Sequence, residues 1–273
     1  MRAPPPDADD EAAWTEWLAW LPAAPAAGSP MPLFARFRAA LLDAGVAEAE
    51  ADRRLQAVQR LMRARPDGWA TMFDNIYTAA APGFSTAPNA LLAAAVAGRA
   101  PGRALDVGMG QGRNALFLAR AGWTVTGVDL AGAGLRRARE DAARAGLAIA
   151  TVRAGRDDFD YGVGRWELVL LAYAPLPAPV APYVERLRRA LSPGGLLVVE
   201  SFASDGARER RRPVDVDPAE LRAALDGWLV HRFDDAVGTP DWGDRDARLV
   251  RAVAERRAEP GVHLPLTATA SGR

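Results

Sequence analysis

From about residue 102 to residue 255 the chain alternates short apolar runs with amphipathic stretches, and this pattern constrains the fold more than any other feature. The apolar runs predict seven strands, at residues 103–107, 124–129, 148–153, 168–172, 196–202, 229–237 and 247–255. Helices are expected between them, at residues 114–121, 135–145, 180–191 and 218–226. Strands that alternate with helices of this length form a largely parallel sheet with helices on both faces. The sequence therefore predicts a doubly wound, Rossmann-like α/β fold.

The last two predicted strands are joined by a connection too short to hold a crossover helix, at about residues 238–243. Strands joined in this way pair antiparallel. A Pro-Gly-Gly turn at residues 193–195 is expected to feed the fifth strand. We therefore expect a seven-stranded sheet, mostly parallel with an antiparallel last strand, which is more particular than a generic dinucleotide-binding fold.

Helical periodicity fills the chain before this alternating region. Apolar residues recur at helical spacing over residues 11–21, and two further helices are expected within residues 32–64, separated near Gly45. Shorter helices are expected at residues 69–78 and 89–97. The chain then divides into three regions: an N-terminal helical extension over residues 1–70, an α/β domain over residues 71–258 and a mobile tail over residues 259–273.

The amino-acid composition excludes several kinds of chemistry. The 273-residue chain has no cysteine, and all 34 residues counted as lysine plus arginine are arginines. Thiolate metal sites, cysteine nucleophiles and Schiff-base lysines are therefore excluded. With only two histidines, a histidine-rich metal site is not expected either, and we expect no metal.

The formal net charge is zero, so electrostatics does not favour nucleic acid or an anionic membrane as a partner. The one dense basic cluster, at residues 208–212, is interpreted as a solvated loop. The longest uncharged stretch, residues 168–184, is interrupted by four prolines and is unsuited to a membrane helix. The N-terminus lacks the charge order of a secretory signal. We expect a cytoplasmic protein that binds neither nucleic acid nor membrane.

The glycine-rich segment over residues 106–114 carries the expected chemistry. A predicted strand ends just before Gly108, Gly110 and Gly112, and a helix begins just after them. Glycines let the backbone approach a ligand closely, and the helix N-terminus offers unpaired N–H groups. Asp106, just before the glycines, would repel a pyrophosphate. It could instead attract a cationic ammonium group, such as the one in the methionyl half of S-adenosylmethionine.

Further positions at strand ends complete a candidate nucleoside site. Asp129 ends the second strand, where a carboxylate is expected to accept both ribose hydroxyls, and Leu130 is suited to pack on adenine. After the third strand, Asp157 or Asp158 could accept the adenine amino group, and Phe159 could supply an apolar wall. Ligands of such sheets bind at the carboxyl ends of the strands beside the topological switch point. The candidate set also includes Met109, Asn114 and Ala172.

From about residue 73 to residue 255 the chain resembles the class I S-adenosylmethionine-dependent methyltransferases. The segment DVGMGQGRN at residues 106–114, with Tyr77 and the segment FSTAPN at residues 84–89 upstream, is similar to a bacterial branch of them. That branch lies near the tellurite-resistance and thiopurine methyltransferases. The resemblance implies a seven-stranded sheet, S-adenosylmethionine as methyl donor and S-adenosylhomocysteine as product. Residues 71–258 would then form the S-adenosylmethionine-binding methyltransferase domain.

The resemblance also implies roles for particular residues. Asp106 and residues 108–112 would line the methionyl part of the donor. Asp129 would hold the ribose, and residues 157–159 would border the adenine.

Methyl transfer from a sulfonium is an in-line displacement on an activated donor, so the protein mainly aligns the reactants and excludes water. Without cysteine, the covalent route to the 5-position of pyrimidines is excluded. Residues 171–175 also lack the Asn/Asp-Pro-Pro-aromatic tetrapeptide typical of amino-methylating DNA enzymes. We therefore expect a small-molecule acceptor. Tyr77 and Tyr173 are candidate walls of its pocket or simple packing residues, and Arg113 could face an anionic group of the acceptor, although pairing with a surface carboxylate is the favoured interpretation. The sequence identifies no catalytic base, acceptor atom or oligomeric state.

Two other functions stay open. An NAD(P)-dependent oxidoreductase would require Gly-x-Gly-x-x-Gly, whereas Arg113 stands where its third glycine belongs, and the lysine of the short-chain enzymes is absent. A non-catalytic methyltransferase-like scaffold or sensor would keep the glycine-rich turn and Asp129 but fill the acceptor pocket.

Overall fold

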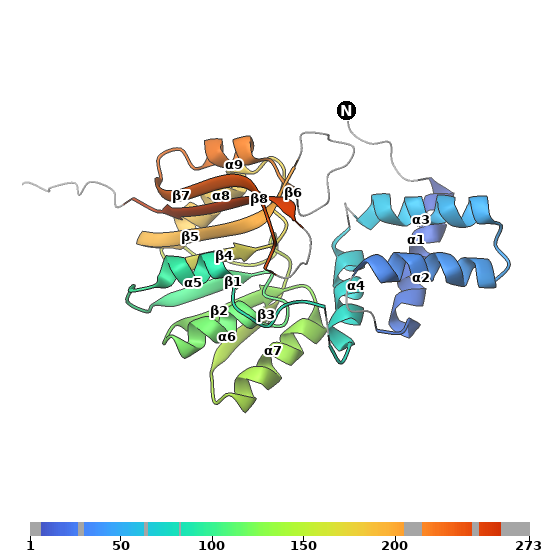
Figure 1. Cartoon of the computed structure of the whole chain (residues 1–273), viewed down its shortest axis with the longest axis horizontal. Coiled ribbons are helices and arrows are strands. Elements are labelled where there is room, and N and C mark those ends of the chain that lie inside the picture. The colour runs from blue at the N-terminus through green and yellow to red at the C-terminus, as the bar shows by residue number, and fades with distance from the viewer. Residues whose placement is uncertain are drawn as a thin grey trace, which may run out of the picture.

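The computed structural model describes residues 7–26, 30–62, 65–81, 83–204, 215–241 and 246–257, and centres on one mixed sheet (Figure 1). The strands within these residues are β1 (Arg103–Val107), β2 (Thr124–Asp129), β3 (Ile149–Arg153), β4 (Trp166–Ala172), β5 (Leu191–Ala203), β6 (Asp215–Val216), β7 (Leu229–Gly238) and β8 (Ala247–Glu255). Their order is β3-β2-β1-β4-β5-β8-β7, and the short β6 pairs with β5. Strand β8 runs antiparallel to both β5 and β7, while the pairs from β3 to β5 are parallel. The predicted fold class is confirmed.

Two details of the sheet differ from the sequence prediction. The two-residue strand β6 is additional, because so short a segment has no periodicity of its own. Strand β5 begins at Leu191, which lies opposite Trp166, and the register shifts between Trp166 and Leu168. The predicted Pro-Gly-Gly turn is therefore an irregular first part of β5, with Gly194 at a φ of 79°.

Helices cover both faces of the sheet, as the alternating pattern predicts. The helices of the described chain are α1 (Ala8–Trp20), α2 (Pro30–Asp43), α3 (Glu48–Met62), α4 (Pro66–Thr78), α5 (Ala90–Val96), α6 (Arg113–Arg120), α7 (Gly132–Arg144), α8 (Ala181–Ala190) and α9 (Pro218–Ala224), with a 3-10 turn η1 (Leu21–Ala23). Side chains alternate between the faces of β1: Ala104 packs in a cluster with α5, α6 and α7, whereas Leu105 packs in a cluster with α8 and α9.

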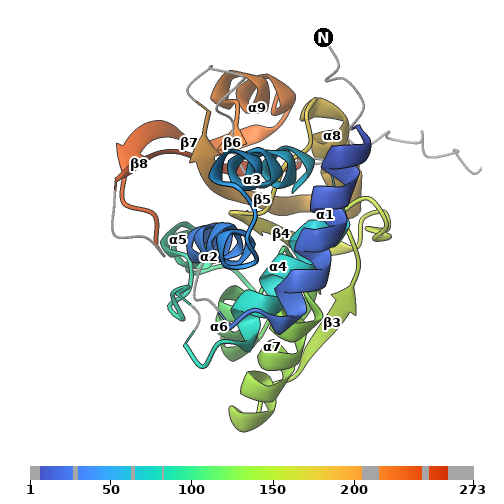
Figure 2. The ribbon, with the colours of Figure 1, turned by 90° about the vertical axis from the view of Figure 1, so that its right-hand side faces the viewer.

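Helices α1 to α4 lie beside one end of the sheet, and viewed from that side they lie in front of it (Figures 1 and 2). They have a hydrophobic core of their own, in which Trp17 is fully buried. The predicted boundary at residue 70 lies inside α4, which contributes Met72 and Ile76 to this helical core. Among the described residues, no helix is long and apolar enough to span a bilayer.

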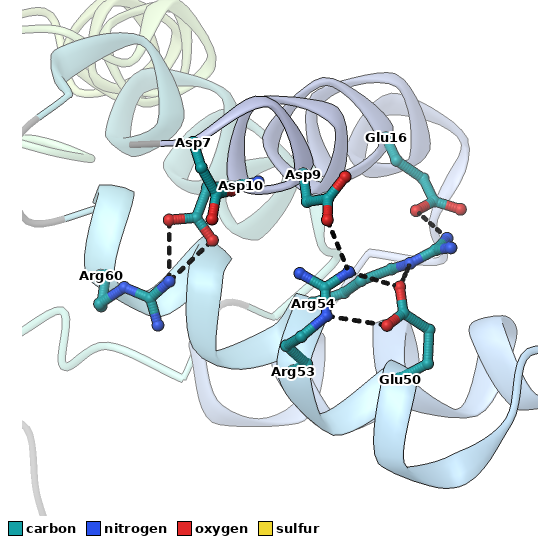
Figure 3. Close-up of polar contacts among 8 residues, drawn as sticks. All are labelled: Asp7, Asp9, Asp10, Glu16, Glu50, Arg53, Arg54 and Arg60. Carbon is teal, nitrogen blue, oxygen red and sulfur yellow. Dashed lines mark hydrogen bonds and ion pairs between the residues drawn. The ribbon is translucent and has the colours of Figure 1, made fainter. Parts of the chain in front are cut away.

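A network of charged side chains joins α1 to α3 across the outside of the helical core (Figure 3). Arg60 contacts Asp10 at 2.7 Å, and Arg54 contacts Glu16 at 2.9 Å. Glu50 lies at 2.7 Å from Arg54 within α3. Exposed pairs of this kind contribute at most ~1 kcal/mol each, so we infer that they set the register of the two helices while the core supplies the stability.

Three regions considered in the sequence prediction lie outside the described residues. These are the basic cluster at 208–212, the tail at 259–273 and residues 242–243 of the connection between β7 and β8.

The aromatic packing of Trp17 predicts a large effect of substitution on stability. Its ring lies at 5.3 Å from that of Phe34 and 5.1 Å from that of Phe37, and its buried Nε1 has no hydrogen-bond partner among the described residues. Trp17→Ala should lower the free energy of unfolding by about 3–5 kcal/mol, measured by urea denaturation. Trp17→Phe should lose much less, because it keeps a ring and removes the unpaired N–H. Equal losses in the two variants would contradict this account.

Candidate functional site

The turn between β1 and α6 is a tightly packed loop of glycines. Gly108, Gly110 and Gly112 have φ values of 71°, 55° and 84°, a backbone region that side chains rarely tolerate. A Cβ at Gly108 would lie 2.9 Å from the Cβ of Ala174, and a Cβ at Gly110 would overlap the Tyr77 hydroxyl. Both the conformation and the close packing therefore require glycine.

Asp129, the last residue of β2, holds this turn in place. One carboxylate oxygen accepts the backbone N–H of Gly110 at 2.8 Å, and the other accepts the N–H of Ala131 at 2.8 Å. Burial raises the pKa of this carboxyl, while the two N–H donors lower it. A carboxylate has about four acceptor positions. Because the Leu130 N–H also bonds to this carboxylate, the predicted ribose ligand keeps room for about one further hydrogen bond at the carboxyl end of β2.

Asp106 is the most unusual group at the site. Its side chain is 1% exposed, and its Oδ2 atom has no hydrogen-bond partner among the described residues. Burial raises the pKa of Asp106 to about 7, while Arg113 lowers this pKa and Asp129 raises it. A buried, unsatisfied carboxylate is costly, and such groups cluster at functional sites. A cationic group placed beside Oδ2 would remove this cost.

Helix α4 brings Tyr77 against the turn. The Asp74 carboxylate accepts the N–H of Ala133 at the start of α7, at 2.6 Å. In return, Arg137 of α7 donates to the carbonyls of Tyr77 and Ala79, at 3.1 and 2.8 Å. These reciprocal contacts fix the end of α4, and burial raises the pKa of the Tyr77 hydroxyl. The helical region thus forms one wall of the turn.

The residues predicted to border the adenine do not all lie together. Leu130 and Asp158 both lie close to Gly155, where a Cβ would be 3.6 and 2.8 Å from their side chains. Asp157 instead turns towards the surface, at 3.5 Å from Arg156 and 3.8 Å from Arg186. Phe159 packs edge-on against Tyr161, with the ring centres 5.1 Å apart.

Three further predicted positions are occupied within the protein itself. Met109 is 5% exposed, and its sulfur packs against Gly127 in the core. The carboxamide oxygen of Asn114 accepts the N–H of Asn89 at 2.8 Å. Ala172, at the end of β4, packs partly buried against the same core cluster as Met109. In Met109 the backbone, and not the side chain, remains suited to line a ligand.

A polar network at the carboxyl ends of β4 and β5 includes residues that the sequence prediction missed. The Tyr173 hydroxyl donates to Glu200 at 2.7 Å, and the Asn89 amide donates to Glu200 and to Asp241, at 3.0 and 2.8 Å. Asp241 also forms a largely buried ion pair with Arg113 at 2.9 Å. Glu200 is the one charged residue in the apolar run at 196–202, and this was the sequence signal that could have identified it as a candidate site residue. Within the described ranges, no three histidine or carboxylate side chains gather as a metal site requires.

Part of this region matches a known protein family in sequence. Residues 104–195, which contain the glycine-rich turn and Asp129, match the family described as a methyltransferase domain. Hemagglutinin 1 of Eikenella corrodens is 28% identical over 160 residues, which are 56% of this chain and 52% of that protein. The chain thus spans about half the length of the curated relative that it matches.

Solved structures share the fold at low sequence identity. TehB from Haemophilus influenzae aligns with a TM-score of 0.54 and 18% identity, over 69% of this chain and 67% of that one. A protein solved in work on converting a disulfide bond into a thioacetal group in echinomycin biosynthesis aligns with a TM-score of 0.53 and 24% identity, over 69% and 92%. The [4+2]-cyclase SpnF aligns with a TM-score of 0.52 and 18% identity, over 62% and 79%. Residues 104–195 thus match a methyltransferase-domain family, and the sheet order is that of the fold these solved structures share.

Proposed function

We propose that this protein transfers a methyl group from S-adenosylmethionine to a small-molecule acceptor. The observation that carries the proposal is the buried Oδ2 of Asp106, which has no partner among the described residues and stands beside the glycine-rich turn. A donor with an ammonium group and no phosphate satisfies this oxygen. A nicotinamide dinucleotide would instead bring a pyrophosphate against a carboxylate, which is unfavourable.

The donor residues fit a nucleoside that lies across the carboxyl ends of β1, β2 and β3. Asp106 would bind the ammonium group, the turn at residues 108–112 would line the methionyl chain, and Asp129 would accept the ribose hydroxyls. Leu130 and Asp158 would border the adenine, because both lie beside Gly155. S-adenosylmethionine would supply an activated methyl group on a sulfonium.

The protein's part in the reaction is to orient the reactants and exclude water. Tyr77 closes the turn from one side, and helices α1 to α4 stand at that end of the sheet (Figure 2). The acceptor would bind on the other side, near Tyr173 and the ion pair of Arg113 with Asp241. The zero formal net charge supports a small molecule over a nucleic acid.

The ribose assignment predicts the effect of removing the Asp129 carboxylate. Asp129→Ala should weaken binding of S-adenosylhomocysteine by about 1–3 kcal/mol, measured by calorimetry, because buried hydroxyls and the Gly110 N–H lose their acceptor. Asp7→Ala is the matched control, because this exposed carboxylate also accepts a backbone N–H, that of Asp10, but caps α1 and belongs to no strand end of the proposed site. Unchanged affinity in Asp129→Ala, or saturable NADH binding by the wild type, would refute the assignment.

The raised pKa of Asp106 predicts that the free energy of unfolding depends on pH. Folding raises its pKa from about 4 to about 7, so between these pH values the folded state holds the proton more tightly than the unfolded chain. Its contribution to stability is therefore fully present below pH 4 and is lost as the pH rises through 7. Asp106→Asn should match the wild type near pH 4 and exceed its free energy of unfolding by up to ~4 kcal/mol at pH 8, measured by urea denaturation.

The same variant separates stability from binding. Because the neutral amide provides no charge for an ammonium group, Asp106→Asn should bind S-adenosylhomocysteine at least about tenfold more weakly while it folds more stably. Binding as tight as that of the wild type would show that Asp106 is not the ammonium ligand. A difference in stability independent of pH would show that its carboxyl does not titrate as described.

A further inference from the structure

We propose that Tyr173 and Glu200 take up the proton of an acceptor whose nucleophile is an O–H or N–H group, such as a phenol. The inference rests on the proposed methyl transfer and names its acceptor class and its proton acceptor. It stands on the placement of Tyr173 beside the glycine-rich turn and on the two hydrogen bonds by which Glu200 holds it.

The order of the strands places Tyr173 on the acceptor side. The ribose ligand Asp129 ends β2 and the ammonium ligand Asp106 lies on β1, so the proposed donor spans these two strands. The neighbour of β1 on its other side is β4, and Tyr173 is the first residue after β4. The next residue, Ala174, packs directly against Gly108 of the turn. Tyr173 therefore stands next to the donor on the side that the nucleoside leaves open.

Glu200 holds Tyr173 by both its backbone and its side chain. Tyr173 has a φ of 58°, a conformation that is unfavourable for a bulky residue and persists only where its surroundings impose it. Its N–H donates to the Glu200 carbonyl at 2.7 Å, and its hydroxyl donates to the Glu200 carboxylate at 2.7 Å. One residue thus fixes the direction of the phenol. Backbone strain of this kind is typical of functional sites.

The surroundings of the pair are charged and nearly closed. Glu200 is 2% exposed. Its carboxylate lies 3.3 Å from the guanidinium of Arg251 on β8 and accepts the Asn89 amide at 3.0 Å. The Tyr173 hydroxyl also accepts the backbone N–H of Asp241, in the connection after β7, and Arg113 is the ion-pair partner of Asp241. The ion pair with Arg251 compensates the buried charge, so Glu200 presents a carboxylate to the Tyr173 hydroxyl.

The pair accounts for the proton of the acceptor. The proton of the acceptor passes to the Tyr173 oxygen as the Tyr173 proton passes to Glu200. The electrons freed on the acceptor oxygen or nitrogen form the bond to the methyl carbon. The two electrons of the broken carbon–sulfur bond stay on sulfur. An acceptor that is already ionised, such as a thiolate, has no proton to lose and does not need Tyr173 and Glu200. The Tyr173 ring is held in turn by its packing on the buried ring of Phe202, with the ring centres 5.4 Å apart.

Phenol and thiophenol test this inference as matched acceptors, because they share one ring and only thiophenol is largely ionised at pH 8. Tyr173→Phe and Glu200→Gln should each lower kcat/KM for phenol by about 100-fold or more. For thiophenol both variants should stay within about threefold of the wild type. Tyr173→Phe keeps the ring in place, so it tests the hydroxyl even if Glu200→Gln folds poorly.

A binding measurement gives a second readout that does not depend on turnover. Phenol and its methyl ether, anisole, are titrated by calorimetry into protein saturated with S-adenosylhomocysteine. Tyr173→Phe should weaken phenol binding about three- to tenfold, because one hydrogen bond is lost, and leave anisole binding unchanged.

The outcomes separate this inference from the proposed function. If the wild type binds no S-adenosylhomocysteine, the proposed function fails and the inference fails with it. If the nucleoside binds but methyl reaches thiophenol alone, or neither acceptor, only the inference is overturned. Equal losses with phenol and thiophenol also overturn it, because the pair would then serve only to hold the strand ends.

Discussion

The hydrogen bond from the Gly110 N–H to Asp129 is the contact on which the site depends. It ties the first turn of the sheet to the end of β2, and the other oxygen of the same carboxylate holds the start of α7. The N–H groups of Gly108 and Met109 donate to the carbonyl of Val128 on the same strand, at 2.8 and 3.1 Å. The turn is therefore preorganised by β2 before any ligand arrives, which lowers the entropic cost of binding.

The helical region becomes part of the site through the same turn. Tyr77 packs on Gly110, and the exchanged contacts between α4 and α7 keep it there. Helices α1 to α3 pack on α4 through a shared hydrophobic core that includes Trp17. Helices α1 to α3 are thus linked to the turn by their packing on α4. A change in their core should reach the turn through α4.

The sequence was sufficient for most of the sheet, though not for β6 or the start of β5, because periodicity and turn chemistry are local. The apolar runs marked β1 and β2 at their observed ends, and the short last connection predicted the antiparallel pairing of β7 and β8. The polar network was not predictable in this way. Asn89, Glu200 and Asp241 are each more than forty residues from the next, and only the sheet order brings them together. Met109 belongs to the glycine-rich motif, but the motif does not show that its side chain points into the core.

The buried carboxylates explain why the protein accepts a cost in stability at this end of the sheet. Asp106 lies under the first turn of α6 with one oxygen unsatisfied, and Asp129 nearby raises its pKa further. Glu200 has its lone pairs satisfied by neighbours, so its charge is tolerated, whereas that of Asp106 is not. A fold selected for stability alone would place neutral groups at Asp106. Under the proposed function the unsatisfied oxygen is one half of an ion pair, and a cationic nucleoside that completes it would bind and stabilise the protein through the same contact.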